Sequence, residues 1–430
     1  MKNPRELGYH AIYNVIYQGG YSNIAINKIL RKNELDGINR GFFTELVYGT
    51  IENKLYLDYV IQKYSRQKLQ ELSKEVLVIL EMGLYQIREM DSVTDFAAVD
   101  ESVKLCKKVF PKGSGFVNAV LRNVLRDPGA FDIDIKAPLE RISVEYSVSP
   151  DIAGLLADQY GIEEAEDIMY GFSMKPKLYI RANSLKTTVS KLAELLREEG
   201  AEPEETEGVK DALSVKNLKN IENSRSYKEG LFSVQDISSM KCVRELGPQP
   251  GEYILDLCSC PGGKTGYIAE LMKNEGSIDA MDISENKLEL VKNTCRRLGV
   301  SIVRTRQNDA TVYSEDMAAR YDRVLVDAPC SGIGIIRRKP EIRYKTIKDI
   351  SSIYNVQRKI IQNASRYVKP GGVMIYSTCT INREENQYIT DEFLKKNSNF
   401  ERVQDDIMML PSDGESDGFY ICKLKRISGQ

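Results

Sequence analysis

Two cysteines of the chain are candidates for nucleophilic chemistry. Cys330 lies in the run Asp-Ala-Pro-Cys-Ser-Gly and Cys379 in Ser-Thr-Cys-Thr, each directly after an apolar stretch that predicts a buried strand. A free thiol has a pKa of about 8.5, so a nucleophilic cysteine needs help to ionise. Cys379 precedes a helix that we expect to begin near Asn382, and a helix N-terminus favours the thiolate. Four further cysteines are expected to be small core residues: Cys106, Cys242, Cys295 and Cys422.

Four carboxylates follow apolar stretches in the same part of the chain: Asp256, Asp282, Asp309 and Asp327. One such aspartate is explained equally well as the cap of a helix or turn. Four at the carboxyl ends of parallel strands, beside a Gly-Gly turn, indicate a ligand site, with Asp282 placed to take the hydroxyls of a ribose. A helix start after the turn offers N–H groups to a carboxylate. The arrangement predicts S-adenosylmethionine, held by Asp282, Asp309, Asp327 and the loop Cys258, Ser259, Cys260, Pro261, Gly262, Gly263 and Lys264.

The same loop disfavours other kinds of site. A P-loop would need a glycine at the position of Cys258, and the dinucleotide fingerprint G-x-G-x-x-G is absent. The pair Cys258 and Cys260 has no second close pair, and His10 is the single histidine, so neither a metal site nor a histidine base is expected. Because the start of the chain lacks an apolar signal segment and no apolar run could span a membrane, we expect a cytoplasmic protein with reduced thiols and no membrane partner.

The elements that must position these residues fall into three segments. Residues 1–130 carry 18 Lys and Arg against 15 Asp and Glu, residues 131–250 carry 15 against 22, and residues 251–430 carry 27 against 25. Apolar residues at three- and four-residue spacing predict a bundle of six or seven helices in the first segment. The second mixes short strands with helices, as in a small α+β domain. The third alternates strands and helices, which predicts a doubly wound parallel sheet with its ligand at the carboxyl ends of the strands.

Several runs of the chain are similar to a known family. Asp-Leu-Cys-x-x-Pro-Gly-Gly-Lys-Thr at 256–265, Asp-Ala-Pro-Cys-Ser-Gly at 327–332 and Ser-Thr-Cys-Thr with Glu-Glu-Asn at 377–386 resemble the RNA cytosine-C5 methyltransferases. Residues 39–50 and 116–122 resemble the NusB-like RNA-binding bundle. The combination is typical of the RsmB/Sun (Fmu) family of bacterial small-subunit rRNA methyltransferases. Cys260 departs from the family, which usually has a small residue such as alanine there.

The resemblance implies three domains: a NusB-like all-α bundle over 1–130, a small α+β RNA-binding domain over 131–250, and a Rossmann-like class I methyltransferase domain over 251–430. It implies transfer of a methyl group from S-adenosylmethionine to C5 of a specific cytosine in 16S rRNA, which in the family is cytosine 967. By the same resemblance Cys379 adds to C6 of the base, Cys330 assists release of the product, and Asp327 bonds the N3 and amino edge of the cytosine.

Basic and polar residues in the middle segment and after the Cys330 run are candidates for RNA contacts: Arg181, Asn183, Arg337 and Arg338. A solvated basic turn is the alternative for the last two. The expected partner is 16S rRNA in a naked or early-assembly state, and the expected protein is a monomer.

Other functions stay open at this point. The target could be a cytosine of another rRNA or of tRNA, or the chain could be a NusB-like RNA-binding adaptor with weak activity. A small-molecule or protein methyltransferase is a third possibility, although such an enzyme needs neither the paired cysteines nor the bundle.

Overall fold

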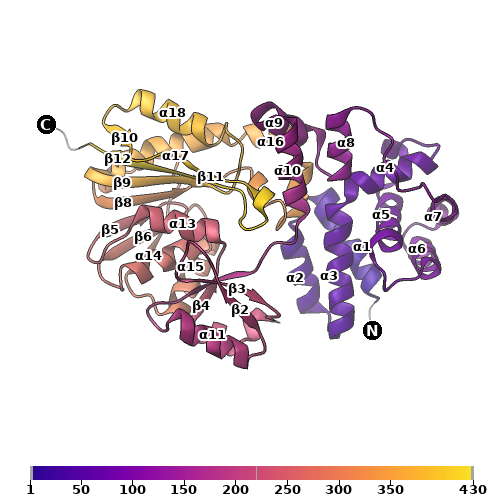
Figure 1. Ribbon diagram of the computed structural model, residues 1–430, viewed down its shortest axis with the longest axis horizontal. Coiled ribbons are helices and arrows are strands. Elements are labelled where there is room, and N and C mark those ends of the chain that lie inside the picture. The colour runs from indigo at the N-terminus through magenta and orange to yellow at the C-terminus, as the bar shows by residue number, and fades with distance from the viewer. Residues whose placement is uncertain (1–2, 219, 428–430) are drawn as a thin grey trace. The chain divides into compact units, whose positions relative to one another are not determined.

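The computed structural model describes residues 3–218 and 220–427, and these form two compact units (Figure 1). The helical unit consists of residues 3–173 with 336–347, and the sheet unit consists of 174–335 with 348–427. The boundaries expected at 130 and 250 do not coincide with this division. Residues 131–173 continue the helical unit, and 174–250 join the unit of the large sheet.

The helical unit begins with seven α-helices in the first 130 residues, which confirms the predicted bundle of six or seven. The helices are α1 (Pro4–Gln18), α2 (Ser22–Lys32), α3 (Gly37–Glu52), α4 (Lys54–Tyr64), α5 (Lys74–Glu89), α6 (Asp95–Val109) and α7 (Ser114–Arg126), followed by α8 (Pro138–Glu145), α9 (Pro150–Tyr160) and α10 (Ile162–Ser173). Ser73 and Thr94 cap α5 and α6 by accepting backbone N–H bonds. Residues 76–86 of α5 are all buried, so this helix forms the centre of the core.

A segment from the second half of the chain completes the helical unit. Residues 336–347 contain the short 3-10 helix η6 (Pro340–Tyr344). Arg343 is buried and donates hydrogen bonds to the carbonyls of Tyr146, at 2.8 Å, and Phe172, at 2.6 Å. The Tyr344 hydroxyl donates to the Ile51 carbonyl. The chain therefore enters the helical unit six residues after Cys330 and leaves it twelve residues later.

The sheet unit contains a small antiparallel sheet with the strand order β2-β3-β1-β4. Its elements are β1 (Tyr179–Ala182), α11 (Val189–Glu198), β2 (Glu202–Glu205), β3 (Ala212–Lys216), α12 (Arg225–Lys228) and β4 (Phe232–Val234). This part of the chain mixes short strands with helices, as the sequence predicted. The small mixed α+β arrangement is thereby confirmed.

The large sheet has the strand order β10-β12-β9-β8-β5-β6-β7, with β11 paired to β12. Strands β5 to β9 run parallel to one another and β12 is antiparallel. The strands are β5 (Tyr253–Asp256), β6 (Ser277–Asp282), β7 (Val303–Gln307), β8 (Tyr321–Asp327), β9 (Val368–Thr378), β10 (Phe400–Arg402), β11 (Ile407–Met409) and β12 (Phe419–Arg426). The predicted doubly wound parallel sheet is confirmed.

Helices cover both faces of this sheet. Helices α13 (Ile237–Leu246) and α14 (Gly263–Leu271) pack on the side of Ile254 and Ile278. Helices α17 (Tyr354–Tyr367) and α18 (Gln387–Lys396) pack on the side of Leu255 and Val324. The remaining helices are α15 (Glu285–Leu298) and α16 (Ile347–Ser351). Successive residues of a strand point to opposite faces of the sheet, and here apolar residues pack against helices on each face. Both faces are therefore buried, as expected for a parallel sheet.

Neither a membrane span nor a metal cluster is found among the described residues. No described helix has the length and apolar character to cross a bilayer. Likewise, no group of three or more His, Cys, Asp and Glu side chains in the described chain is arranged to hold a metal ion.

Candidate active site

Strand register brings the predicted strand-end residues to one edge of the large sheet. Asp256 pairs with Ala280, so Asp282 lies two residues further along β6. Asp256 also pairs with Leu325, two residues before Asp327, and Asp327 pairs with Ser377 of β9. The four parallel strands therefore end together, which is where an open α/β sheet binds its ligand.

The loop between β5 and α14 forms a close backbone turn beside this edge. The amide and hydroxyl of Ser259 both donate to the Met281 carbonyl, at 2.8 and 3.0 Å. Gly262 has φ +98°, and a Cβ there would lie 3.1 Å from the Val291 Cα. Only glycine adopts this conformation without strain. Helix α14 thus begins directly after the turn. The first N–H groups of the helix have no partner within it and are available to a ligand.

A pocket of about 200 Å³ opens at the turn. Seven of the ten predicted cofactor residues line it: Cys258, Ser259, Cys260, Pro261, Gly263, Lys264 and Asp327. Gly262, Asp282 and Asp309 lie outside this lining. Sequence reasoning missed four lining residues, Val234, Gln235, Asp236 and Ser239, from the end of β4 and the start of α13. Gln235 and Asp236, which directly follow the run Leu-Phe-Ser-Val at 231–234, were the signal that could have found them.

Asp282 and Asp309 each use one oxygen to hold their own turn. Asp282 is buried, and its Oδ1 accepts from the Ser284 amide at 3.2 Å and lies 3.5 Å from Lys287 Nζ. Asp309 is exposed, and its Oδ1 accepts from the hydroxyl and amide of Thr311, at 2.7 and 2.9 Å. These two bonds hold the pKa of Asp309 below its ordinary value. The capping role and a ligand role are therefore compatible, because a carboxylate has two oxygens.

Asp256 is the most deeply buried of the strand-end carboxylates. Its Oδ2 accepts from the Thr265 hydroxyl at 2.6 Å, while its Oδ1 is buried with no hydrogen-bond partner. Burial raises the pKa of Asp256 to about 7, although the Thr265 bond lowers it, and the negative charge of Asp327 adds to the rise. An unmet acceptor in a pocket wall is a position that a ligand donor can satisfy.

Lys264 and Asp327 form an ion pair in the pocket wall. Lys264 Nζ lies 2.7 Å from Asp327 Oδ2, and the Ser377 hydroxyl donates to Asp327 Oδ1 at 3.1 Å. Burial lowers the pKa of Lys264, but the charge and hydrogen bond of Asp327 together with the interactions of Cys242 and Cys379 keep it above its ordinary value. The ammonium also lies 5.2 Å from the centre of the Phe419 ring, so the pair is held from two sides.

The two strand-end cysteines lie against each other, with 3.2 Å between their sulfur atoms. The bond to Cys379 and burial together raise the pKa of Cys330 well above its ordinary range. The raised pKa favours the thiol form of Cys330, and either sulfur can be the donor in its contact with Cys379. The positive charge of Lys264, which interacts with Cys379, favours a thiolate there.

The helix predicted near Asn382 begins later than expected. Helix α18 starts at Gln387, and residues 382–386 form turns instead. The side chain of Asn386 holds these turns by bonding Thr378 and Thr380, at 2.6 and 2.9 Å. The prediction that a helix N-terminus directly supports the Cys379 thiolate is therefore wrong. The four other cysteines predicted as core residues are buried as expected: Cys106, Cys242, Cys295 and Cys422.

The expectation that Arg181 and Asn183 contact RNA is wrong, because both side chains are fully buried. The Arg181 guanidinium donates to both oxygens of Glu270, at 2.9 and 2.7 Å, and to Gln235. It also donates to the Gly263 carbonyl at 3.0 Å and lies over the Tyr267 ring. Residue type alone could not show that the partner carboxylate lies within the same unit.

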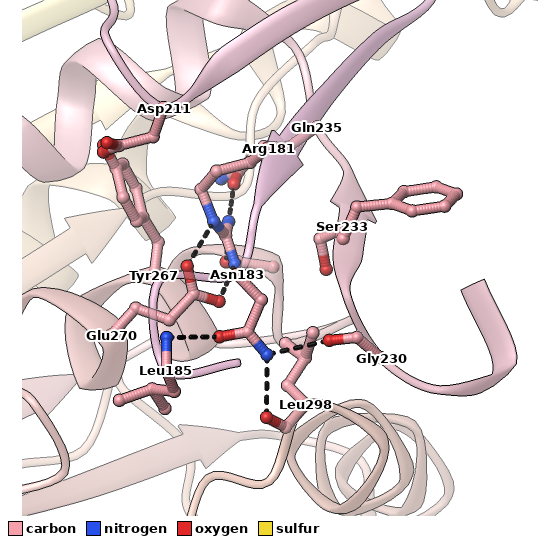
Figure 2. Close-up of polar contacts among 12 residues, drawn as sticks. Arg181, Asn183, Leu185, Asp211, Gly230, Ser233, Gln235, Tyr267, Glu270 and Leu298 are labelled. Atoms are coloured by element: carbon pink, nitrogen blue, oxygen red, sulfur yellow. Dashed lines mark hydrogen bonds and ion pairs between the residues drawn. The ribbon is translucent and has the colours of Figure 1, made fainter. Parts of the chain in front are cut away.

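The side chain of Asn183 likewise makes its hydrogen bonds within the fold. Its side-chain amide donates to the carbonyls of Gly230 and Leu298, both at 2.8 Å (Figure 2). In the segment that joins the helical unit, Arg337 is only 4% exposed, so it does not present its guanidinium to RNA. Arg338 is half-buried, and of the four predicted contacts it alone keeps part of its side chain at the surface.

Comparisons with known proteins agree with this geometry. The profile of the 16S rRNA methyltransferase RsmB/F family matches residues 243–425, and that of the NusB family matches 2–126. A ferredoxin-like domain of RsmF/B-like methyltransferases matches 153–222. Among curated proteins, the chain is 36% identical to the probable ribosomal RNA small subunit methyltransferase B of Bacillus subtilis, over 98% of both chains. The Synechocystis protein of the same name is 31% identical over 99% of this chain and 100% of its own.

Solved structures show the same architecture. The crystal structure of PH0851 superposes with a TM-score of 0.83 and 26% identity, over 98% of this chain and 99% of that one. NSun6 from Pyrococcus horikoshii, solved with SFG, shares the fold with a TM-score of 0.60 and 23% identity over 65% of this chain and 99% of its own. The fold is thus a Rossmann-like methyltransferase sheet with a small mixed domain and an N-terminal NusB-type helical domain. The chain belongs to the ribosomal RNA small subunit methyltransferase B family, whose members depend on S-adenosylmethionine.

The residues at the sheet edge fit this cofactor. The ligand carries an ammonium group, a carboxylate and a ribose diol, and the edge offers acceptors and donors for each. The unmet Oδ1 of Asp256 and the buried carboxylate of Asp282 supply acceptors. The N-terminus of α14 and Lys264 supply positive charge for a carboxylate.

Proposed function

We propose that this protein transfers a methyl group from S-adenosylmethionine to C5 of one cytosine of 16S rRNA, the equivalent of cytosine 967 in the family, through a covalent bond between Cys379 and C6. The observation that carries the proposal is the pair of sulfur atoms 3.2 Å apart at the same sheet edge as the pocket. Asp327 joins the two parts, because it lines the pocket and lies three residues before Cys330.

Cytosine C5 is a weak nucleophile, and Cys379 is proposed to change that. Its thiolate adds to C6, the C5=C6 electron pair moves to give an enamine, and C5 becomes nucleophilic. The bound cofactor supplies an electrophilic methyl group on its sulfonium, which C5 accepts. Asp327 is proposed to accept from the amino group beside N3 and so to hold the base over Cys379, with Lys264 balancing the carboxylate.

Release then needs a base, and Cys330 is our candidate. The bond to Cys379 is the largest cause of its raised pKa, burial is the second, and the charge of Cys379 adds to both. Once Cys379 is bonded to carbon its charge is gone, so ionisation of Cys330 becomes easier. A Cys330 thiolate takes the proton from C5, the C5–H pair restores the C5=C6 bond, and the sulfur of Cys379 leaves with the C–S electron pair.

The substrate is proposed to be naked or early-assembly small-subunit RNA, acted on in the cytoplasm by a monomer. A base inside a helix must leave its stack to reach Cys379, and this is easier before assembly buries the RNA. Arg338 remains a candidate contact for RNA phosphates.

The test is to incubate the full chain with methyl-labelled cofactor and 16S rRNA from cells that lack this modification. Digestion of the RNA should yield labelled 5-methylcytidine, and bisulfite sequencing should place it at a single cytosine. Label on an exocyclic nitrogen or a ribose would overturn the C5 assignment. Preferred methylation of tRNA or of another rRNA would replace the substrate while keeping the chemistry.

A further inference from the structure

Two neighbouring buried residues, Glu385 and Asn386, take no part in the chemistry described above. Both lie in the turns between β9 and α18, and both are fully buried. Asn386 bonds Thr378 and Thr380, the residues on either side of Cys379. Asn386 therefore holds the loop of the proposed nucleophile.

Glu385 holds the other cysteine loop. Its Oε2 accepts from the Ser331 amide at 2.7 Å and from Gln357 Nε2 at 3.0 Å. Its Oε1 accepts from Asn382 Nδ2 at 3.0 Å. Gln357 of α17 is itself buried and also donates to the Pro329 carbonyl at 3.0 Å. The residues before and after Cys330 are thus both fixed by the Glu385 and Gln357 pair.

The two loops are also bonded directly to each other. The hydroxyls of Ser331 and Thr380 lie 2.9 Å apart, and the Gly334 amide donates to the Cys379 carbonyl at 3.1 Å. Cys379 directly follows β9, and the hydrogen bonds of β9 with β8 and β12 fix the start of the Cys379 loop. Cys330 follows the end of β8 by three residues, in the run Ala328 to Gly332 that the structure assigns to neither helix nor strand. The Cys330 loop therefore depends more on side-chain bonds than the Cys379 loop does.

We propose that Glu385 is a positioning residue that sets the Cys330 sulfur against the Cys379 sulfur, and that this setting serves release of the methylated base. The inference rests on the proposed covalent mechanism. Addition to C6 requires only Cys379, whose loop keeps Asn386 and the strand ladder when Glu385 is changed. Release requires Cys330, and a displacement of about 1 Å in a reacting group can cost about 100-fold in rate.

The test compares Glu385→Gln with Glu384→Gln in the full chain, using methyl-labelled cofactor and 16S rRNA that lacks the modification, in single-turnover and rapid-quench experiments. Glutamine keeps the size of the side chain but replaces one acceptor oxygen by an NH₂ group that opposes the surrounding N–H donors. Glu384 is the neighbouring half-buried carboxylate and takes no part in these bonds. For Glu385→Gln we expect methyl transfer within about threefold of wild type and release slowed by about tenfold or more, with a labelled protein–RNA adduct that accumulates. Glu384→Gln should match wild type.

Gln357→Leu is the second variant, in case Glu385→Gln fails to fold. It removes the donor to Pro329, and it should also slow release more than transfer. Equal losses in transfer and release in both variants would mean a merely structural role, and release at the wild-type rate would overturn the proposal outright.

Cys330→Ala serves as the reference. If it accumulates adduct while the Glu385 and Gln357 variants do not, the positioning role fails and the covalent mechanism stands. If Cys330→Ala itself forms no adduct, the proposed mechanism fails and the positioning role in release fails with it.

Discussion

Two cations of the sheet unit, Arg181 and Lys264, differ in burial and in use. Arg181 belongs to a cluster that we call the anchor, with Glu270, Gln235 and the Gly263 carbonyl (Figure 2). Lys264 belongs to the proposed catalytic edge, which comprises Lys264, Asp327, Cys330 and Cys379. Both cations pair with a carboxylate at 2.7 Å. The distance alone therefore does not separate a structural pair from a functional one.

The surroundings of the two pairs make the difference. Arg181 and Glu270 have fully buried side chains, and the guanidinium donates to protein acceptors from each of its three nitrogens. Lys264 and Asp327 keep partly exposed side chains and line the pocket. A buried ion pair satisfied entirely by protein holds elements together, whereas a pair that also lines a pocket can act on a ligand. The anchor nevertheless supports the edge, because it bonds the first residue of α14.

The largest expected effect is on stability, from Arg181→Ala. The variant leaves Glu270 buried without its cation, so the free energy of unfolding should fall by about 3–5 kcal/mol. The matched control is Arg304→Ala at an exposed position of β7, where a change within about 0.5 kcal/mol is expected. Denaturant melts measure both, and equal stability of the two variants would contradict the anchor.

The joint variant Arg181→Met with Glu270→Leu sharpens the same comparison. Replacing both charges by apolar groups removes the unpaired carboxylate, so it should recover a large part of the stability lost in Arg181→Ala. If Arg181 instead bound RNA, its loss would weaken RNA binding without changing the melt.

The next effect concerns pH and Asp256. Its pKa is about 7 in the folded protein, against 3.8 ordinarily, because burial favours the neutral acid. Between pH 4 and 7 the unfolded chain has released this proton while the folded chain still holds it. The contribution of Asp256 to the free energy of unfolding is therefore fully present below pH 4 and is lost as the pH rises from 4 to 7. The loss amounts to at most about 4 kcal/mol, and above pH 7 the contribution no longer changes.

Asp256→Asn tests this by removing the titrating group. The stability of the wild type relative to the variant should be greater at pH 5 than at pH 8, as measured by denaturant melts in matched buffers. A difference that stays constant across this range would show that Asp256 is already ionised in the folded protein.

The smallest effect is on cofactor affinity. Asp282→Ala should weaken binding of S-adenosylmethionine by about 1–3 kcal/mol, or about 5- to 150-fold, because a buried polar partner is lost. Asp309 is exposed, so Asp309→Ala should weaken binding less. Calorimetry on the full chain gives both affinities. Unchanged affinity for Asp282→Ala would remove Asp282 from the site.

Much of the catalytic edge could be predicted from the sequence, because parallel strands end at one edge. Once Asp256, Asp282 and Asp327 were assigned to strand ends, their common location followed from topology. The sequence also assigned Cys330 and Cys379 to strand ends at this edge, whereas their contact depends on β8 and β9 being neighbours, which the structure shows. Periodicity likewise predicted six or seven helices in the first 130 residues, and the described residues 3–130 contain seven α-helices.

Features that depend on long-range partners could not be predicted. Arg181 looks like a surface base until Glu270, 89 residues away, is placed beside it. The start of α18 was misjudged because helical periodicity does not show that Asn386 bonds the preceding loop. The local sequence does not show that residues 336–347 belong to the helical unit. Arg343 donates there to the carbonyls of Tyr146 and Phe172, which are far from it in the sequence.

The central claim is that Cys379 forms the bond to the base and Cys330 releases it, and a denaturing gel with labelled 16S rRNA tests it directly. In Cys330→Ala the nucleophile remains, so the RNA should stay bonded to the protein and run as a slow, protein-linked band. In Cys379→Ala nothing adds to C6, so neither an adduct nor methyl transfer should appear. The reverse pattern would exchange the two roles, and the absence of an adduct in both variants would contradict covalent catalysis by this pair.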